Sequence, residues 1–259
     1  MNTGDIQAPG AASLPRAEEE LTIIVERGIL RASAPLCDKC RVYPDKFCSC
    51  APLRKKARLF TNLNLPARFR HATMESIRSY SPLNQPLRPL YQWIEAWSRR
   101  NPLPTEGILV SGPCGIGKTH ALVALLRHLT LSRSVPCLFL DWNRFLQKLK
   151  SAYEGNDSTS DCFLAIHDTE VLLLDDLGAS RGTEWEIFML DEVISIRYNA
   201  LLPTFITTNL RIGEGESRSE IEKVFLHHTT SRLAELCHRI SLAGDDRRGV
   251  GLRQLVIRD

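Results

Sequence analysis

The glycine-rich segment at residues 112–119 combines residue types that can bind a polyanion. It reads Gly-Pro-Cys-Gly-Ile-Gly-Lys-Thr. Its glycines allow the tight backbone path by which several N–H groups converge on phosphate, the lysine reaches the β- and γ-phosphates, and the threonine hydroxyl ligates magnesium. An apolar strand is expected before the segment and a helix after it, and that helix adds its positive N-terminus. The segment therefore predicts a phosphate-binding loop for ATP.

We assign nucleotide binding to the whole loop and to the histidine that follows it. The assigned residues are Gly112, Pro113, Cys114, Gly115, Ile116, Gly117, Lys118, Thr119 and His120. Lys118 is also assigned a catalytic role, and Thr119 is assigned as a magnesium ligand. Cys114 has no chemistry of its own and is expected to fill space in the loop.

Polar residues that follow two apolar runs are the candidates for the rest of the site. Asp175 and Asp176 follow a run of leucines, and Asn209 follows Thr207 and Thr208. The carboxyl ends of parallel strands are the sheet edge where ligands bind. We assign Asp175 to magnesium, Asp176 to the attacking water, and Asn209 to a sensor of the γ-phosphate. Because fast ATPases usually carry glutamate in the second acidic position, the shorter aspartate predicts slow hydrolysis.

Four of the eight cysteines lie close together as Cys37, Cys40, Cys48 and Cys50. Tetrahedral zinc is the usual outcome for thiolates at this density, with free thiols and an iron–sulfur cluster as the alternatives. A nucleotide-binding chain without a secretory leader is expected in a reducing compartment, which disfavours disulfides. So small a module has little room for chemistry, and we expect it to recognise a partner.

Apolar runs alternate with helical segments from residue 106 onward. Such strands, near-continuous in apolar residues and separated by helices, predict an α/β domain whose parallel sheet is covered by helices on both faces. The expected strands are 107–110, 137–140, 171–174, 204–207 and 239–243, and the expected helices are 117–131, 143–154, 183–200 and 217–238. A further helix is expected near 88–100.

Four regions are expected along the 259 residues. Their hydrophobic content of 43% supports one core of about 150–200 residues with a smaller appendage. The regions are a disordered tail at 1–16, an N-terminal helix (17–30) with the cysteine module and a basic stretch at 17–60, a connector and helix at 61–104, and the ATPase domain at 105–259.

The charge is nearly balanced, with 33 basic and 30 acidic residues and a net charge of +3. Any nucleic-acid surface must therefore come from local clustering of basic residues. We find neither an apolar run of about 18 residues nor a leader, so we expect no membrane span and a cytoplasmic location. Candidates for contact with DNA are Arg144, Phe145, Lys148, Lys150, Tyr153 and the pair Ser180–Arg181.

In their order and spacing these motifs resemble the AAA+ superfamily and, more narrowly, the bacterial replicative-helicase loader family (DnaC-like). The resemblance covers about 65–250. A related IstB-like branch shares much of this core and assists transposases. The segments that carry the resemblance are 65–69 (LPARF), 117–120 (GKTH), 174–178 (LDDLG), 181–183 (RGT), 197–204 (RYNALLPT) and 207–210 (TTNL).

The resemblance also implies partners and two catalytic arginines. Family members act as oligomers that load or remodel a ring-shaped, hexameric replicative helicase on single-stranded DNA, and some carry a small metal module. Arg232 matches an arginine finger that acts on the ATP of a neighbouring subunit, so hydrolysis is expected at the interfaces of a homo-oligomer. Arg248 matches a second sensor within its own subunit, and Arg247 competes for that role.

Three functions remain open on these grounds. The chain is a helicase loader, a transposase regulator that binds duplex DNA, or an interaction module with an inactive ATP site. Asp176 and Arg232 argue against the third, since mere binding requires neither residue. The metal module and the segment 197–204 favour the loader, although fold similarity alone does not decide function.

Overall fold

A central parallel sheet organises the computed structural model of the chain, which describes residues 21–34, 37, 48, 50–80, 85–154, 160–178, 182–212, 220–221 and 225–246. The sheet has five strands in the order β4-β5-β6-β3-β7. Every pairing between neighbours is parallel. The strands are β3 (Gly107–Ser111), β4 (Cys137–Asp141), β5 (Val171–Leu177), β6 (Thr204–Thr208) and β7 (Cys237–Ser241).

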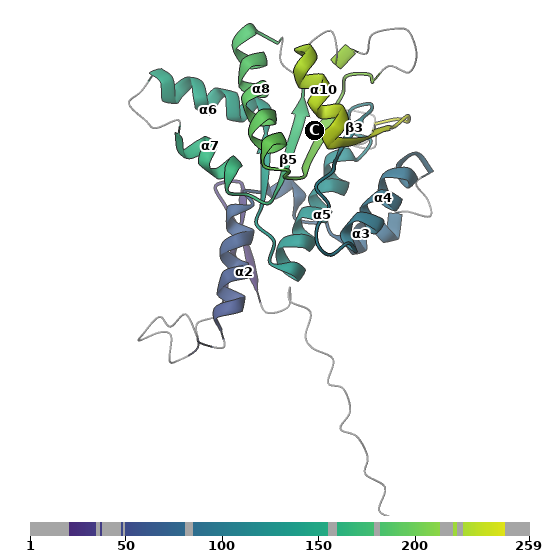
Figure 1. Ribbon diagram of the computed structural model, residues 1–259. Helices are drawn as coiled ribbons and strands as arrows, with labels where there is room; N and C mark the ends of the chain where they lie inside the picture. Colours follow the sequence, from purple (N-terminus) through teal and green to yellow (C-terminus); the bar gives the residue numbers. More distant parts are fainter. Residues whose placement is uncertain are drawn as a thin grey trace, which may run out of the picture.

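Helices cover both faces of this sheet, because successive side chains of each strand point to opposite faces. On β5, Leu173 joins one hydrophobic cluster while Leu172 and Leu174 join another. One face packs against α3 (Met74–Tyr80), α4 (Arg88–Ser98) and α5 (Lys118–Arg133), and the other against α6 (Trp142–Glu154), α7 (Ser160–His167), α8 (Glu184–Asn199) and α10 (His227–Leu236) (Figure 1). This arrangement confirms the predicted fold class.

The predicted elements of this domain agree with the structure to within a few residues, with two exceptions. In the range predicted as a helix at 217–238, residues 220–221 are helical, 217–219 and 222–224 lie outside the described residues, and α10 begins at His227 and ends at Leu236, with its C-cap Cys237 already extended. The last strand therefore begins at Cys237, two residues before the predicted start. The helix α7 was not predicted. Among the described helices, none is both long and apolar enough to span a membrane.

The N-terminal helix predicted at 17–30 is wrong, because the described residues of this stretch form an antiparallel hairpin. Its strands are β1 (Thr22–Glu26) and β2 (Ile29–Ser33). The β-branched run at 22–25 favours extended backbone. Arg27 and Gly28 both adopt positive φ, 49° and 79°, which is the geometry of a two-residue hairpin turn. The helical spacing of apolar residues here was coincidental.

The segment between the hairpin and the sheet packs directly on the ATPase core. The basic stretch after Cys50 lies in α2 (Ala51–Asn62), followed by a 3-10 turn, η1 (Ala67–Phe69). Leu30 and Phe60 belong to the same hydrophobic cluster as Leu122 and Phe139. The hairpin and α2 are therefore continuous with the core. The predicted tail at 1–16 lies outside the described residues.

Candidate functional site

The glycine-rich loop leaves β3 and leads into α5, as its sequence predicts. Gly112, Gly115 and Gly117 all have positive φ, at 150°, 73° and 111°. A Cβ atom on Gly115 would lie 1.7 Å from Asp246 Oδ1, so a side chain here would overlap a residue that follows β7. Gly117 caps α5 without a side-chain hydrogen bond. The first turn of α5 can therefore direct its N–H groups at an anion.

Lys118 is buried and its amine lies over the loop. Its Nζ donates hydrogen bonds to the carbonyl oxygens of Gly112 and Pro113, at 2.7 and 2.9 Å, and to Asn209 Oδ1 at 2.8 Å. Only 7% of the residue is exposed. An ammonium group held at the mouth of the loop is suited to phosphate oxygens, which can replace the backbone carbonyls as acceptors.

Asp175 and Thr119 meet at the carboxyl end of the sheet, where a magnesium ion would be held. Asp175 Oδ1 accepts hydrogen bonds from Thr119 Oγ1 at 2.6 Å and from Thr207 Oγ1 at 2.7 Å. Burial raises the pKa of Asp175, and the two hydroxyls oppose this shift. A buried carboxylate paired with a hydroxyl provides the oxygen ligands that magnesium prefers, so these residues fit the ion.

Asn209 joins the remaining parts of the site. Its amide nitrogen donates to Asp176 Oδ1 at 2.8 Å, and its amide oxygen accepts from Lys118. This bridge exists because β6 lies between β3 and β5 in the sheet. The predicted lysine, acids and asparagine are therefore in one hydrogen-bonded network.

The backbone at Asp176 explains why an aspartate stands in the second acidic position. The pairing of β5 with β6 is irregular between Leu174 and Leu177, and Asp176 has a φ of 59°. Aspartate and asparagine tolerate this left-handed conformation better than longer side chains do. Irregular strand pairing of this kind is frequent beside active sites.

Sequence reasoning missed two residues of the site. Thr207 donates its hydroxyl to Asp175 and accepts a hydrogen bond from the backbone N–H of Asp176 at 2.9 Å. The signal was a buried polar residue at the end of an apolar strand. Arg68 Nη2 lies 3.7 Å from Asp175 Oδ2. The resemblance drew attention to the segment 65–69, but no spacing rule connects that segment to Asp175.

Thr207→Val is expected to weaken magnesium-dependent ATP binding by about tenfold or more, because residues that orient a metal ligand commonly contribute this much. It also leaves the Asp176 N–H without its acceptor, which should lower the free energy of unfolding by about 1–3 kcal/mol. Titration with a fluorescent ATP analogue and urea unfolding measure the two effects. Thr208→Val is the control, since Thr208 donates to Leu177 O at 2.7 Å and not to Asp175. Equal effects of the two variants on ATP binding would contradict the assigned role.

The other residues assigned to nucleotide binding differ in their surroundings. Cys114 is exposed in the loop, and Ile116 is buried. His120 Nε2 lies 3.2 Å from Ser76 Oγ on α3. Burial, together with the charges of Arg127 and His71, lowers the pKa of His120. Its ring therefore contacts α3, on the side of α5 that packs against that helix.

Arg232 lies on α10 and faces α8. Its Nη1 donates to Asp191 Oδ1 at 3.0 Å and to Ser195 Oγ at 2.7 Å. Asp191 Oδ1 also accepts from Thr229 Oγ1 at 2.7 Å. These contacts hold the guanidinium against α8. Arg247 and Arg248 lie outside the described residues.

Three of the four clustered cysteines converge. Cys37 Sγ lies 3.2 Å from Cys48 Sγ, and Cys50 Sγ lies 3.5 Å from the same atom. The three sulfur atoms lie within 4.8 Å of one another and could hold a metal ion. Cys40 is outside the described residues. Three soft ligands at this spacing suit zinc and disfavour magnesium or calcium.

The candidate DNA contacts fall into two groups. Phe145 is 6% exposed and packs in the core beside Trp142, so it is unavailable to DNA. Tyr153 is 59% exposed and meets the Trp185 ring edge-on, with 6.2 Å between the ring centroids. Arg144, Lys148 and Lys150 are exposed as well. Ser180 and Arg181 lie outside the described residues.

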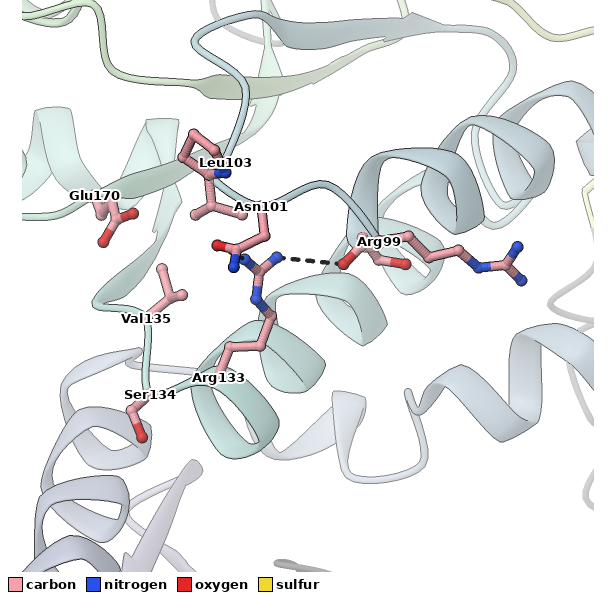
Figure 2. A pocket seen from close by; sticks show the side chains of 9 residues that line it. Arg99, Asn101, Leu103, Arg133, Ser134, Val135 and Glu170 are labelled. Carbon is pink, nitrogen blue, oxygen red and sulfur yellow. Dashed lines mark hydrogen bonds between the residues drawn. The ribbon is translucent and has the colours of Figure 1, made fainter.

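An open hollow of about 700 Å³ lies at the opposite edge of the sheet. Figure 2 shows Arg133 pointing toward Asn101 within it, and Arg133 Nη2 donates to Asn101 Oδ1 at 3.2 Å. Val135 and Glu170, which also line it, precede β4 and β5. The phosphate loop and paired acids lie at the other ends of the strands, so this hollow is separate from the candidate site.

Comparison with known families and sequences gives one family match. The family described as IstB-like ATP binding protein matches residues 95–253. In Bacillus subtilis (strain 168), the protein called Uncharacterized protein YqaM is 31% identical over 114 residues, or 42% of this chain and 36% of that protein. Replicative helicase loader DnaI of the same organism is 29% identical over 153 residues, 55% of this chain and 48% of that protein. The chain thus spans half or less of these relatives' lengths.

Solved structures share the fold. A DnaC helicase loader superposes with a TM-score of 0.57 at 24% identity, covering 68% of this chain and 99% of that one. The structure of DnaI superposes with a TM-score of 0.57 at 20% identity, covering 69% of this chain and 94% of that one. The replication initiator DnaA bound to AMPPCP and single-stranded DNA superposes with a TM-score of 0.55 at 15% identity, covering 68% of this chain and 51% of that one. At these identities the likeness concerns the fold alone.

Proposed function

The chain belongs to the family of IstB-like ATP-binding proteins, and we propose that it is an ATP-dependent helicase loader. In this proposal it binds a replicative DNA helicase and single-stranded DNA, and ATP binding followed by slow hydrolysis switches the assembly. The observation that carries the ATPase part is the network of Lys118, Asn209 and Asp176 beside the Thr119–Asp175 pair. The similarity to DnaI supports the helicase part.

Each residue of the network has one role in the proposed hydrolysis. Lys118 and the loop N–H groups would bind the phosphates, and Thr119 and Asp175 would hold a magnesium ion, which would supply positive charge to neutralise them. Asp176 accepts a proton from the water that attacks the γ-phosphorus, as ADP leaves with the electron pair of the broken P–O bond. Asn209 reaches both Lys118 and Asp176, so its amide is suited to sense whether the terminal phosphate is present.

Arg232 is proposed to act on the ATP of a neighbouring subunit. Its contacts with Asp191 and Ser195 hold it on α10 against α8. An arginine finger neutralises charge on the transferring phosphoryl group. Hydrolysis would then need a homo-oligomer in the ATP state, and Arg248 would add the second sensor within each subunit.

The cysteine cluster is proposed to bind zinc and to serve in partner recognition. The support is the convergence of Cys37, Cys48 and Cys50, with Cys40 as the fourth ligand by sequence. Four sulfur ligands close the coordination sphere, which makes such a site structural. We retain the functional division into a tail at 1–16, the module at 17–60, a connector at 61–104 and the ATPase domain at 105–259 as part of this proposal.

Binding to labelled single-stranded and duplex DNA tests the proposal by fluorescence anisotropy. The titrations use an ATP analogue, ADP or no nucleotide, with Lys118→Ala beside the wild type. We expect preference for single strands with the ATP analogue, and loss of that preference in the variant. Equal or tighter binding to duplex DNA with the ATP analogue would contradict the loader. It would favour the second candidate, a transposase regulator, which the IstB-like family match also supports.

A further inference from the structure

Arg68 lies beside the magnesium-site carboxylate, although it precedes the region at 95–253 that matches the ATPase family. Its Nη2 is 3.7 Å from Asp175 Oδ2, and its side chain is 63% exposed. The other oxygen, Oδ1, already accepts two hydroxyl hydrogen bonds. Arg68 therefore faces the oxygen of Asp175 that neither threonine hydroxyl contacts.

The position of Arg68 is set by the backbone around it. Phe69 is 7% exposed and packs against Phe139, with 5.7 Å between the ring centroids. Arg127, on the helix that begins at the phosphate loop, donates from Nη1 to the carbonyl oxygens of Phe69 and Arg70 at 3.3 and 2.7 Å. These contacts fasten the 3-10 turn η1 to α5, so Arg68 keeps a defined place relative to the loop.

Among the described residues, the guanidinium of Arg68 keeps N–H donors that are available to a ligand. It stacks 4.7 Å from the centroid of the Phe69 ring, and 3.7 Å from Asp175 is beyond hydrogen-bond length. Among the residues that the structure describes, we find no hydrogen bond from this guanidinium. Arginine carries five N–H donors in a planar fork that suits phosphate oxygens.

We propose that Arg68 contacts the terminal phosphate of a nucleoside triphosphate bound in its own subunit. This inference rests on the proposed ATP site. Lys118 would hold the β- and γ-phosphates and Thr119 the magnesium beside them, and the Thr119 hydroxyl is 2.6 Å from the carboxylate that Arg68 faces. A γ-phosphate held there would lie beside Arg68, whereas a nucleoside diphosphate has no γ-phosphate. Arg68 thus makes the site prefer triphosphate to diphosphate.

Equilibrium binding of fluorescent ATP and ADP analogues to the full chain tests this assignment. Arg68→Ala should weaken binding of the ATP analogue by about tenfold or more, because tenfold is the lower end of what a hydrogen bond to a charged group contributes, and should change ADP binding less than about twofold. Arg68→Lys should restore part of the difference, since it keeps the charge. Arg70→Ala is the matched control, because it removes the same charge from an exposed side chain that contacts His71 at 2.9 Å.

Repeating the titrations with and without magnesium separates the alternatives. A contact with phosphate predicts weaker ATP binding by Arg68→Ala in both conditions. If Arg68 only competed with magnesium for Asp175, the variant would bind magnesium and ATP more tightly, and the proposal would be overturned. An equal loss of affinity for ATP and ADP in Arg68→Ala, or no loss for either, would also overturn it, although the proposed ATP site would still stand. A wild-type chain that binds neither nucleotide would refute the proposed function itself, and this contact with it.

Discussion

Asp176→Asn is expected to slow ATP hydrolysis by about 10²- to 10⁴-fold while ATP binding stays nearly unchanged, because the amide cannot accept the proton of the attacking water. The fold should tolerate the change. Asp176 has a φ of 59°, a conformation that asparagine adopts readily, and the introduced amide oxygen can still accept the hydrogen bond from Asn209. Single-turnover hydrolysis and analogue titration measure the two quantities.

Asp141→Asn is the matched control for this experiment. Asp141 ends β4 and pairs in register with Asp175, so it lies on the same edge of the sheet. Its carboxylate accepts from the backbone N–H of Arg144 at 3.1 Å and has no part in the proposed reaction. We expect this variant to hydrolyse ATP at the wild-type rate. Wild-type hydrolysis by Asp176→Asn would show that another group activates the water.

Arg197→Met is expected to lower the free energy of unfolding by about 3–5 kcal/mol, because several buried acceptors lose their donor, and this is a large part of the stability of a typical domain. Arg197 is fully buried on α8. Its five described acceptors are Thr204 Oγ1 and the carbonyl oxygens of Ile166, Thr169, Glu170 and Pro203. Methionine preserves helix propensity and most of the volume but removes the donor that serves all five acceptors.

The charge of Arg197 persists despite its burial. Burial lowers its pKa to about 10, which is still well above neutral pH. Urea unfolding of the variant measures the effect, and Arg99→Met is the control. Arg99 is 77% exposed and pairs with Glu95 at 3.2 Å, so we expect a change below about 1 kcal/mol. Similar urea midpoints for the two variants would mean that the five hydrogen bonds of Arg197 contribute little to stability.

Much of the candidate site was predictable because its signals are local. The loop at 112–119 needs only glycines, a lysine and a threonine between a strand and a helix. Asp175, Asp176 and Asn209 follow apolar strands, and parallel strands bring their carboxyl ends to one edge. The structure joins these residues through hydrogen bonds, although their roles in catalysis stay predictions.

The hairpin shows where local patterns mislead. Apolar residues at 21, 24, 25 and 29 fit a helix, but they also fit two short strands around a turn. The β-branched run and the turn at Arg27–Gly28 decided between the two, together with packing of β2 on α2 and the β4 side of the core. Tertiary burial routinely overrides a weak preference for helix.

Residue types at short spacing were enough to predict a phosphate loop, a pair of acids, a sensor amide and a cluster of thiols. Which distant groups complete the candidate site depends instead on how the elements pack. The strand order β4-β5-β6-β3-β7 puts Asn209 between Lys118 and Asp176, and the turn at η1 brings Arg68 to Asp175. Such contacts depend on how elements pack around one core, and the spacing of residues along the chain does not predict that packing.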